Sequence, residues 1–121
     1  MSRILLIDDD NDYRTMVKIL LERAGYEVAE AKNGEAGIIL YSQSHYDLVI
    51  TDLFMPQIDG VSIIHKLKAQ INSPKMIAMT GASSDGRMDY LLNLAKENGA
   101  SEVYKKTANI NELLIKVKSL L

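Results

Sequence analysis

The sequence predicts a doubly wound α/β domain in which five parallel strands alternate with five helices. Short apolar runs of strand length recur five times, and each is followed by a segment whose apolar residues repeat every three or four positions. This alternation favours one parallel sheet with helices on both faces, because crossovers between parallel strands are right-handed. Five strands in such a fold commonly take the order 2-1-3-4-5.

The five apolar runs supply the strands. The runs at 3–8 (RILLID), 47–52 (DLVITD) and 75–80 (KMIAMT) are continuously apolar, which is typical of strands buried on both faces of a parallel sheet. The run at 26–31 (YEVAEA) alternates between polar and apolar residues, and the run at 102–106 (EVYKK) is the shortest. Each run is predicted to form one strand.

The first two helices have recognisable ends. The first is predicted over 11–24, with Asp10 or Asn11 as its N-cap and Gly25 in the left-handed position that follows a helix. The second is predicted to begin after Asn33, a capping residue, and to run to about residue 43.

The other three helices are bounded by turn and cap signals. The third follows the turn sequence QIDG at 57–60, and the fourth ends before Gly99. The last covers 110–121, where apolar residues form a stripe after the capping residue Asn109. We therefore expect a (βα)5 pattern without a domain break.

The composition fits one globular domain. The 121 residues are 47% hydrophobic and 25% charged, carry a formal net charge of -2 and include no cysteine. The sequence has no basic stripe with interleaved aromatic residues, so it does not predict direct contact with nucleic acid. The N-terminus is neither a signal peptide nor a membrane span. We expect a single domain over 1–121, with no output domain in this chain, located in the cytoplasm away from membranes.

Four aspartates follow the first predicted strand within five positions. Like charges about 4 Å apart repel by roughly 4 kcal/mol at an effective dielectric constant near 20, so a cation nearby would stabilise them. In the order 2-1-3-4-5 the first and third strands are neighbours, and ligands bind at the switch point between them. Asp8 and Asp9 end the first strand and Asp52 ends the third. These oxygen ligands favour Mg²⁺, or Mn²⁺ in its place.

Other interpretations of the acidic run differ in what they require. A nucleotide pocket would need glycines and backbone N–H groups rather than carboxylates. An EF-hand loop would need glycine and glutamate where this chain has Tyr13 and Ile19, which excludes it. A solvated turn explains the run alone equally well, and it stays the interpretation for Asp10 and Asp12.

A hydroxyl and an ammonium group end the last two predicted strands. Thr80 closes the fourth strand and Lys106 closes the fifth. Beside a metal ion and a carboxylate, these groups suit a phosphoryl group, whose charge they would neutralise while one aspartate acts as the nucleophile and forms an acyl phosphate.

Four stretches of the chain resemble the receiver domain of two-component response regulators, of the type found in chemotaxis regulators. They are ILLIDD (4–9), DLVITDLFMPQIDG (47–60), MIAMTG (76–81) and GASEVYKKTANINELL (99–114). The resemblance covers essentially the whole chain, and its most specific part is the DxxMPxxDG pattern that runs from Asp52 to Gly60. It implies a flavodoxin-like fold and a phosphorylation-controlled signalling switch rather than an enzyme.

The resemblance also implies a role for each matching residue. Asp52 resembles the phosphoacceptor. Asp9, assisted by Asp8, resembles the acidic pair that holds Mg²⁺, and the backbone carbonyl of Phe54 would complete the protein ligands. Two further residues, Thr80 and Lys106, resemble the hydroxyl and the lysine that contact the phosphoryl group.

Partners are implied in the same way. The phosphoryl donor would be a histidine kinase or a histidine phosphotransfer protein. The face formed by the fourth helix, the fifth strand and the last helix would then engage a downstream effector protein or domain. We expect a monomer, and a phosphorylation-linked dimer through that face stays open.

The chain departs from the family pattern near the predicted site. Thr107 replaces the proline that usually follows the lysine, so the Lys106–Thr107 bond is either trans or strained. The switch aromatic of the family corresponds to Val103, and strand alternation points the adjacent Tyr104 the opposite way, which argues against a tyrosine-flip mechanism.

Two more departures concern the segments around the site. The segment from 80 to 99 is about one helical turn longer than usual, so we predict a mobile loop within 81–87, which includes Ala82 as a tuning position. Phe54 occupies a variable position beside the phosphoacceptor, and we hypothesise that its ring shields an acyl phosphate from water.

Two rival functions stay open. A pseudo-receiver would be an interaction module without phosphorylation. The intact set of Asp52, Thr80 and Lys106 argues against it, but Val103 and Thr107 leave it open. A haloacid-dehalogenase-type phosphatase also places Asp-x-Asp, here Asp8 and Asp10, after its first strand, but it needs a second acidic metal motif after the lysine, where this chain has only Glu112.

Overall fold

The computed structural model describes residues 1–55, 58–81 and 87–121, and it confirms the predicted fold. Five strands pair in parallel in the order β2-β1-β3-β4-β5. They alternate with five helices along the chain. The elements are β1 (Arg3–Ile7), α1 (Asn11–Arg23), β2 (Glu27–Ala31), α2 (Gly34–Gln43), β3 (Leu48–Asp52), α3 (Gly60–Lys68), β4 (Lys75–Thr80), α4 (Arg87–Glu97), β5 (Glu102–Lys105) and α5 (Ile110–Leu120).

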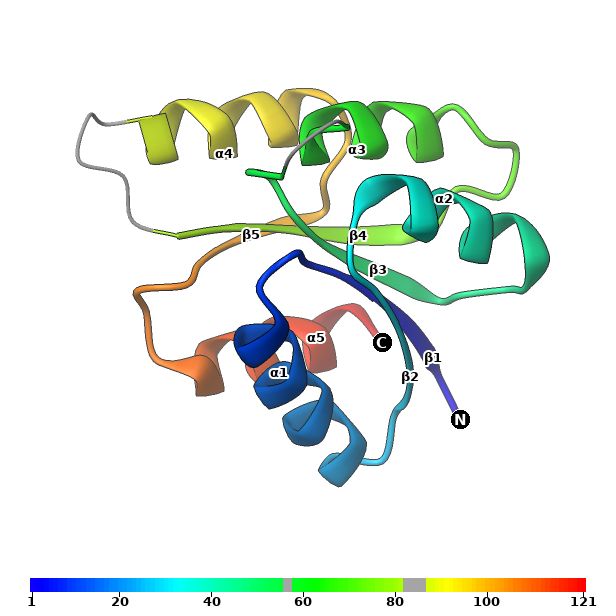
Figure 1. Cartoon of the computed structure of the whole chain (residues 1–121), viewed down its shortest axis with the longest axis vertical. Helices are drawn as coiled ribbons and strands as arrows, with labels where there is room; N and C mark the ends of the chain where they lie inside the picture. Colours follow the sequence, from blue (N-terminus) through cyan, green and yellow to red (C-terminus); the bar gives the residue numbers. More distant parts are fainter. Residues whose placement is uncertain (56–57, 82–86) are drawn as a thin grey trace.

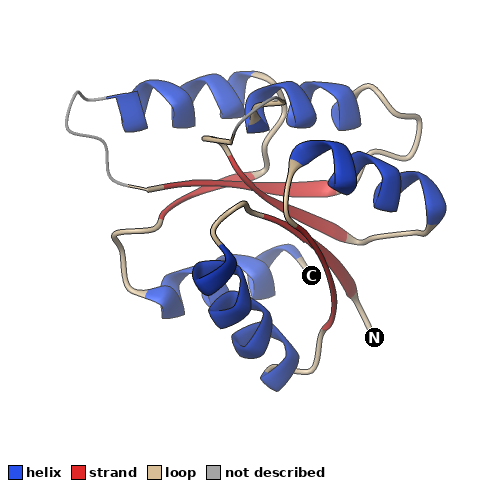
Figure 2. Ribbon diagram, viewed as in Figure 1, coloured by secondary structure: helices blue, strands red, loops and turns tan. Residues whose placement is uncertain are grey.

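Helices cover both faces of the sheet. α1 and α5 lie on one face, and α2, α3 and α4 lie on the other (Figures 1 and 2). β1 shows why its sequence is continuously apolar. Its alternate residues point to opposite faces of the sheet, and each face is covered by a separate hydrophobic core. Leu5 and Ile7 pack on the side of α2–α4, whereas Ile4 and Leu6 pack on the side of α1 and α5. β1 therefore contributes side chains to both cores, as a parallel strand buried on both faces does.

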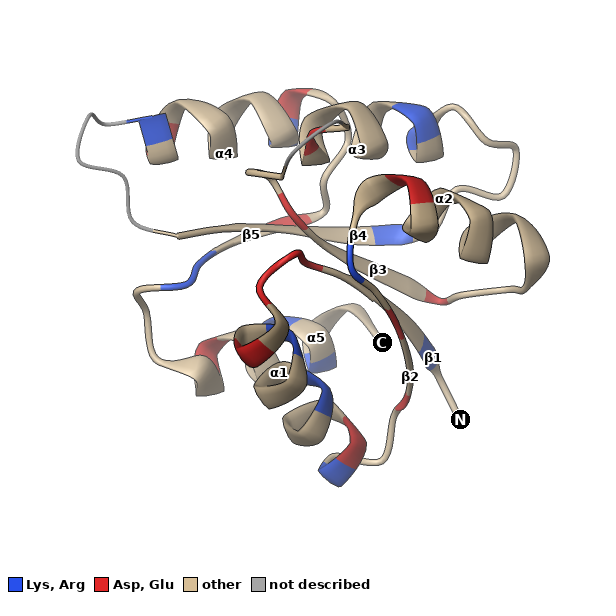
Figure 3. Cartoon of the chain, viewed as in Figure 1, with Lys and Arg blue, Asp and Glu red and all other residues tan. Residues whose placement is uncertain are grey.

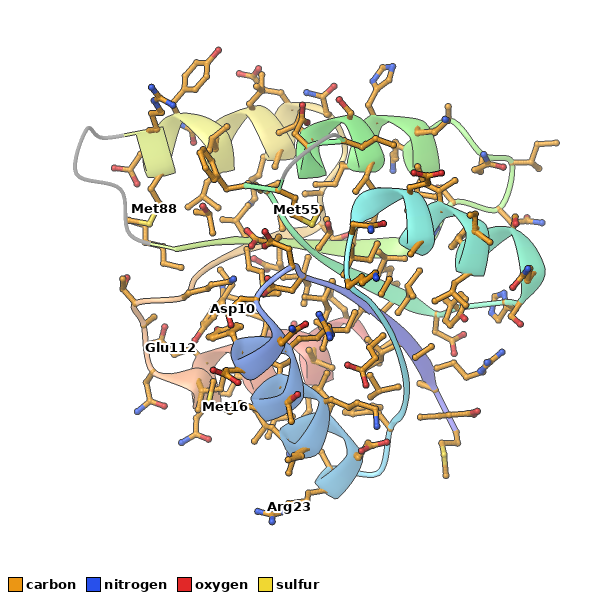
Figure 4. The ribbon with its side chains drawn as sticks, in the orientation of Figure 1. Asp10, Met16, Arg23, Met55, Met88 and Glu112 are labelled. Atoms are coloured by element: carbon orange, nitrogen blue, oxygen red, sulfur yellow. The ribbon has the colours of Figure 1, made fainter. Side chains whose placement is uncertain are left out.

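Most helix ends lie where the capping residues predict them. The side chains of Asp10, Asn33 and Asn109 accept hydrogen bonds from backbone N–H groups in the first turns of α1, α2 and α5. Gly25 and Gly99 both have positive φ, 97° and 118°, and each lies two residues beyond the end of its helix, α1 or α4. Of the two candidates for the first cap, Asp10 is the one used (Figure 4).

Some predicted boundaries need adjustment. α1 ends at Arg23, one residue earlier than predicted, and β5 ends at Lys105 rather than Lys106. Lys106 nevertheless continues the pairing, because its N–H donates to the Thr80 carbonyl at 2.8 Å. The described residues contain no cis peptide bond, so the Lys106–Thr107 bond is trans.

Two sequence predictions fall partly outside the described residues. The loop predicted at 81–87 includes 82–86, which the structure does not describe, and Ala82 lies among them.

In the described ranges, no helix is both long enough and apolar enough to cross a membrane.

Candidate functional site at the carboxyl edge of the sheet

Three aspartates from two strand ends meet at one edge of the sheet. Asp8 and Asp9 follow β1, Asp52 ends β3, and one carboxylate oxygen from each lies within 4.8 Å of the other two. Figure 3 shows acidic residues at the ends of these neighbouring strands. Asp8 and Asp52 are buried, whereas Asp9 is exposed. The predicted convergence at the switch point is therefore confirmed.

Backbone pairing fixes Asp8 at this edge. Its N–H donates to the Ala31 carbonyl at 3.1 Å, which extends the pairing of β1 with β2 by one residue. Its Oδ1 accepts the N–H of Asp10 at 3.0 Å, and its carbonyl accepts Arg14 Nη1 at 2.7 Å. Hydrogen bonds with β2, with the following loop and with α1 therefore orient Asp8 at this edge.

A close backbone approach shapes the loop after Asp52. Asp52 Oδ1 accepts the N–H of Phe54 at 3.1 Å, which turns the chain directly after β3. Gly60 then packs against the end of the strand, where an added Cβ would lie 2.1 Å from the Asp52 carbonyl oxygen and 2.6 Å from Leu53 Cα. Only glycine fits there without a shift of the backbone that carries Asp52.

Lys106 joins the two buried carboxylates. Its Nζ lies 2.7 Å from Asp8 Oδ2 and 3.1 Å from Asp52 Oδ2, and its side chain is 13% exposed. Burial lowers the pKa of Lys106, but the neighbouring carboxylates of Asp8 and Asp52 outweigh it, so the pKa is raised overall. The ammonium group is therefore charged when both carboxylates are.

The Asp52 carboxyl is held away from its usual titration range. Burial, followed by the charge of Asp8, raises the pKa of Asp52 from 3.8 to about 6, against the opposing effect of Lys106. A perturbed carboxyl of this kind, placed beside a cation, is typical of functional sites.

The other predicted site residues lie near this edge in different surroundings. Thr80 is buried at the end of β4, one residue beyond Met79, which pairs with Asp52. Phe54, two residues after Asp52, is 65% exposed. Figure 4 shows Met55, next along the chain, beyond the end of β3.

Val103 and Tyr104 point to opposite faces of β5, as strand alternation predicts. Val103 is half-buried on the side of α2–α4, whereas Tyr104 is buried on the side of α1 and α5. The Tyr104 hydroxyl donates to the Ala108 carbonyl at 3.0 Å, which fixes this tyrosine in its inward position.

Tyr13 is a site residue that the sequence prediction does not include. The Lys106 ammonium group lies over its ring, with Nζ 4.5 Å from the ring centroid. Burial raises the pKa of the Tyr13 phenol, so the group stays neutral. Its place in the first turn of α1, three residues after the Asp10 cap, is the one signal that could have placed it at this edge.

The donor set fits a hard divalent cation. Asp8 Oδ2 is fully buried, and its charge is paired with the Lys106 ammonium group at 2.7 Å. The three carboxylates supply oxygen ligands, which Mg²⁺ prefers. The site thus suits Mg²⁺ better than a soft metal.

A doubly wound sheet with acidic residues and a lysine at its switch point defines a class of α/β domains built for divalent cations and phosphoryl groups rather than for nucleotides. The sequence profile of the response regulator receiver domain matches residues 4–118. The chain therefore belongs to the response regulator receiver domain family, which confirms the resemblance.

Individual proteins and structures agree with this family. The transcriptional regulatory protein SrrA of Staphylococcus aureus is 28% identical over 120 residues, which are 99% of this chain and 48% of that protein. The chain thus spans about half the length of the curated relatives it matches. The response regulator TrrA of Thermotoga maritima, in complex with Mg²⁺ and BeF, is 36% identical, with a TM-score of 0.84 and full coverage of both chains.

A chemotaxis protein shows the same fold. CheY4 of Vibrio cholerae has a TM-score of 0.84 over 100% of this chain and 99% of its own, at 24% identity. At that identity the likeness concerns the fold alone.

Proposed function

We propose that this receiver domain is a phosphorylation-activated signalling switch that accepts a phosphoryl group on Asp52 in a Mg²⁺-dependent reaction. The observation that carries the proposal is the meeting of Asp8, Asp9 and Asp52 within 4.8 Å, with Lys106 Nζ 3.1 Å from Asp52. As a receiver domain, the chain has a histidine kinase as its expected phosphoryl source. A histidine phosphotransfer protein would supply the same phosphohistidine.

The transfer needs one nucleophilic oxygen and one leaving nitrogen. A carboxylate oxygen of Asp52 attacks the phosphorus of a phosphohistidine, a P–O bond forms, and the P–N bond breaks with its electron pair returning to the imidazole. Hydrolysis reverses the state, because water attacks the phosphorus and the P–O bond to Asp52 breaks, which releases inorganic phosphate and restores the carboxylate.

The metal ion would be held by oxygen atoms of this chain. Asp8, Asp9 and Asp52 offer carboxylates, and the Phe54 carbonyl is the proposed fourth protein ligand. TrrA, whose structure holds Mg²⁺ and BeF, supports this assignment by its 36% identity. When bound, Mg²⁺ or Mn²⁺ supplies positive charge that offsets the charge of the phosphoryl oxygens.

Two further residues would contact the phosphoryl group. Lys106 would neutralise one of its oxygens, since the ammonium group already lies 3.1 Å from Asp52 Oδ2. Thr80 would donate its hydroxyl to another oxygen and so report that the site is phosphorylated. Its burial at the end of β4 supports this role.

The signal would leave through the face formed by α4, β5 and α5, where a downstream effector protein or domain binds. Ion pairs join these elements. Lys105 Nζ of β5 lies 3.0 Å from Asp89 Oδ1 of α4, and Lys116 Nζ of α5 lies 3.5 Å from Glu102 Oε2 of β5. The inward, hydrogen-bonded Tyr104 supports a readout without a tyrosine flip. We expect a cytoplasmic monomer that contacts neither nucleic acid nor membranes directly and that forms at most a phosphorylation-linked dimer.

Phe54 would tune the lifetime of the acyl phosphate. Its ring is exposed beside Asp52, where it could cover the phosphoryl group and exclude water. Phe54→Asn is therefore expected to accelerate dephosphorylation, measured as loss of label from the phosphorylated protein. An unchanged rate would contradict the shielding role of the ring.

Acetyl phosphate with Mg²⁺ separates the proposal from its two rivals. A switch takes up one phosphoryl group per chain, and Asp52→Asn takes up none. A phosphatase instead turns over external phosphomonoesters, and a pseudo-receiver does neither. Either of those results, or stoichiometric phosphorylation of Asp52→Asn, would contradict the proposal.

A further inference from the structure

The Lys106 ammonium group lies between two carboxylates and one aromatic ring. Its Nζ is 2.7 Å from Asp8 Oδ2 and 3.1 Å from Asp52 Oδ2, and 4.5 Å from the centroid of the Tyr13 ring. The lysine directly follows β5, whereas the tyrosine comes from the first turn of α1. The contact therefore links two elements that are separated by most of the chain.

The ring rather than the hydroxyl of Tyr13 makes this contact. The Tyr13 hydroxyl is buried, and the structure shows no hydrogen bond from it to Lys106. The contact is made by the face of the ring, because a ring face attracts a cation that is shielded from water.

The backbone near Lys106 is fixed, which leaves the side chain as the variable part. The Lys106 N–H donates to the Thr80 carbonyl at 2.8 Å, and the Ala108 N–H donates to the Lys105 carbonyl at 2.9 Å. The Tyr104 hydroxyl donates a hydrogen bond to the Ala108 carbonyl at 3.0 Å. The four-carbon stem of Lys106 remains, and a flexible stem of this kind loses rotamer freedom when its end is held in one place.

We propose that Tyr13 is a positioning residue for Lys106, whose ring keeps the ammonium group at the Asp52 carboxylate and ready for a phosphoryl oxygen. The inference rests on the proposed function. When Asp52 becomes phosphorylated, the contacts of the ammonium group with Asp8 and Asp52 change, whereas the ring face offers a partner that phosphorylation does not alter. Tyr13 contacts neither the phosphoryl group nor the metal ion in this role.

The test compares Tyr13→Phe, which keeps the ring, with Tyr13→Leu, which keeps an apolar helix-forming side chain but removes the ring. A shielded cation–π contact corresponds to a change in rate of roughly tenfold. With acetyl phosphate and saturating Mg²⁺, we expect Tyr13→Leu to be phosphorylated about tenfold more slowly, and Tyr13→Phe to match the wild type. The Mg²⁺ affinity should change little in either variant, since all three carboxylates remain.

A second background shows whether Tyr13 acts through the lysine. In a Lys106→Ala protein the ring has no ammonium group to hold, so adding Tyr13→Leu should leave the remaining rate unchanged. A merely structural role of Tyr13 would slow phosphorylation in both backgrounds. Equal losses with and without Lys106 would therefore overturn the inference, as would a loss in Tyr13→Phe as large as that in Tyr13→Leu.

NMR of ¹³C-lysine-labelled protein gives a readout that needs no phosphorylation. The Lys106 methylene protons next to Nζ should be shifted upfield by the ring current in the wild type and in Tyr13→Phe, and this shift should vanish in Tyr13→Leu. Lys106 resonances without that shift in the wild type would overturn the inference. If the wild type shows the shift but takes up no phosphoryl group, the proposed function fails while the positioning contact stands.

Discussion

Two adjacent lysines at the end of β5 form ion pairs of similar length in opposite surroundings. Lys105 Nζ lies 3.0 Å from Asp89 Oδ1, and these side chains are 46% and 75% exposed. Lys106 Nζ lies 2.7 Å from Asp8 and 3.1 Å from Asp52, and these three side chains are 13%, 0% and 6% exposed. The comparison teaches that burial, rather than distance, decides what an ion pair contributes.

The physical reason lies in the solvent. At Lys105, water and salt screen the pair, and exposed pairs contribute about 0–1 kcal/mol. At Lys106, the two carboxylates are shielded from water, so removing the lysine leaves buried charges without a partner. At the edge of the sheet that suits a phosphoryl group, stability is therefore more sensitive to the loss of a charge than it is at Lys105.

The largest expected effect is that of Lys106→Ala. This change leaves the carboxylates of Asp8 and Asp52 facing each other, and removing one partner of a buried pair typically lowers stability by about 3–5 kcal/mol. Urea unfolding without Mg²⁺ at neutral pH measures the loss. Adding Mg²⁺ should restore part of it, and a loss below about 1 kcal/mol would contradict the buried pairing.

Asp52→Asn should change stability in the opposite direction. Because the folded protein raises the pKa of Asp52 from 3.8 to about 6, it binds this proton more tightly than the unfolded chain does. The stabilising contribution of the protonated group is complete below about pH 4 and is lost as the pH rises through about 6. Asparagine cannot ionise and so avoids that loss.

The size of this effect follows from the shift in pKa. A shift of about two units corresponds to on the order of 2–3 kcal/mol, so Asp52→Asn should be more stable than the wild type by that amount at about pH 7.5. Thermal unfolding over a range of pH values should show the difference shrinking toward zero near pH 4. A difference that does not depend on pH would contradict the raised pKa.

Gly60→Ala tests how tightly the backbone holds Asp52. The added Cβ would lie 2.1 Å from the Asp52 carbonyl oxygen, so the loop must shift at a cost on the order of 1–3 kcal/mol. Gly81→Ala is the matched control, since a Cβ there would meet nothing within 4 Å. Denaturant unfolding should separate the two variants, and equal stabilities would contradict the close approach.

Lys105→Ala is the smallest expected effect and sharpens the comparison with Lys106. Its exposed partner, Asp89, stays solvated when the lysine is removed, so stability should change by less than about 0.5 kcal/mol. The same urea measurement applies. A loss as large as that of Lys106→Ala would show that exposure does not separate the two pairs.

Much of the fold could be predicted because its signals are local. Ile4, Leu5 and Leu6 form a continuous apolar run that suits a strand buried on both faces, and Asp10 and Asn33 mark helix starts. The convergence of Asp8, Asp9 and Asp52 needed only the strand order and the handedness of crossovers. These features follow from rules that hold for any sequence of this pattern.

The rest depended on contacts that a single sequence does not reveal. Lys105 and Lys106 are the same residue type side by side, and only the packed structure separates the exposed one from the buried one. The ring of Tyr13 reaches Lys106 across 93 positions of sequence, 106 minus 13, and no local pattern pairs a helix residue with a distant loop residue. Likewise, the contact of Gly60 with Asp52 depends on how closely the start of α3 approaches the end of β3.

Calorimetric titration with Mg²⁺ tests the central claim most directly, since that claim is that Asp8, Asp9 and Asp52 form one cation site. We predict uptake of one Mg²⁺ per chain by the wild type and by Lys105→Ala, and a much weaker uptake by Asp9→Asn, whose exposed carboxylate can be neutralised without disturbing the core. No uptake by the wild type, or an unchanged affinity in Asp9→Asn, would contradict the account.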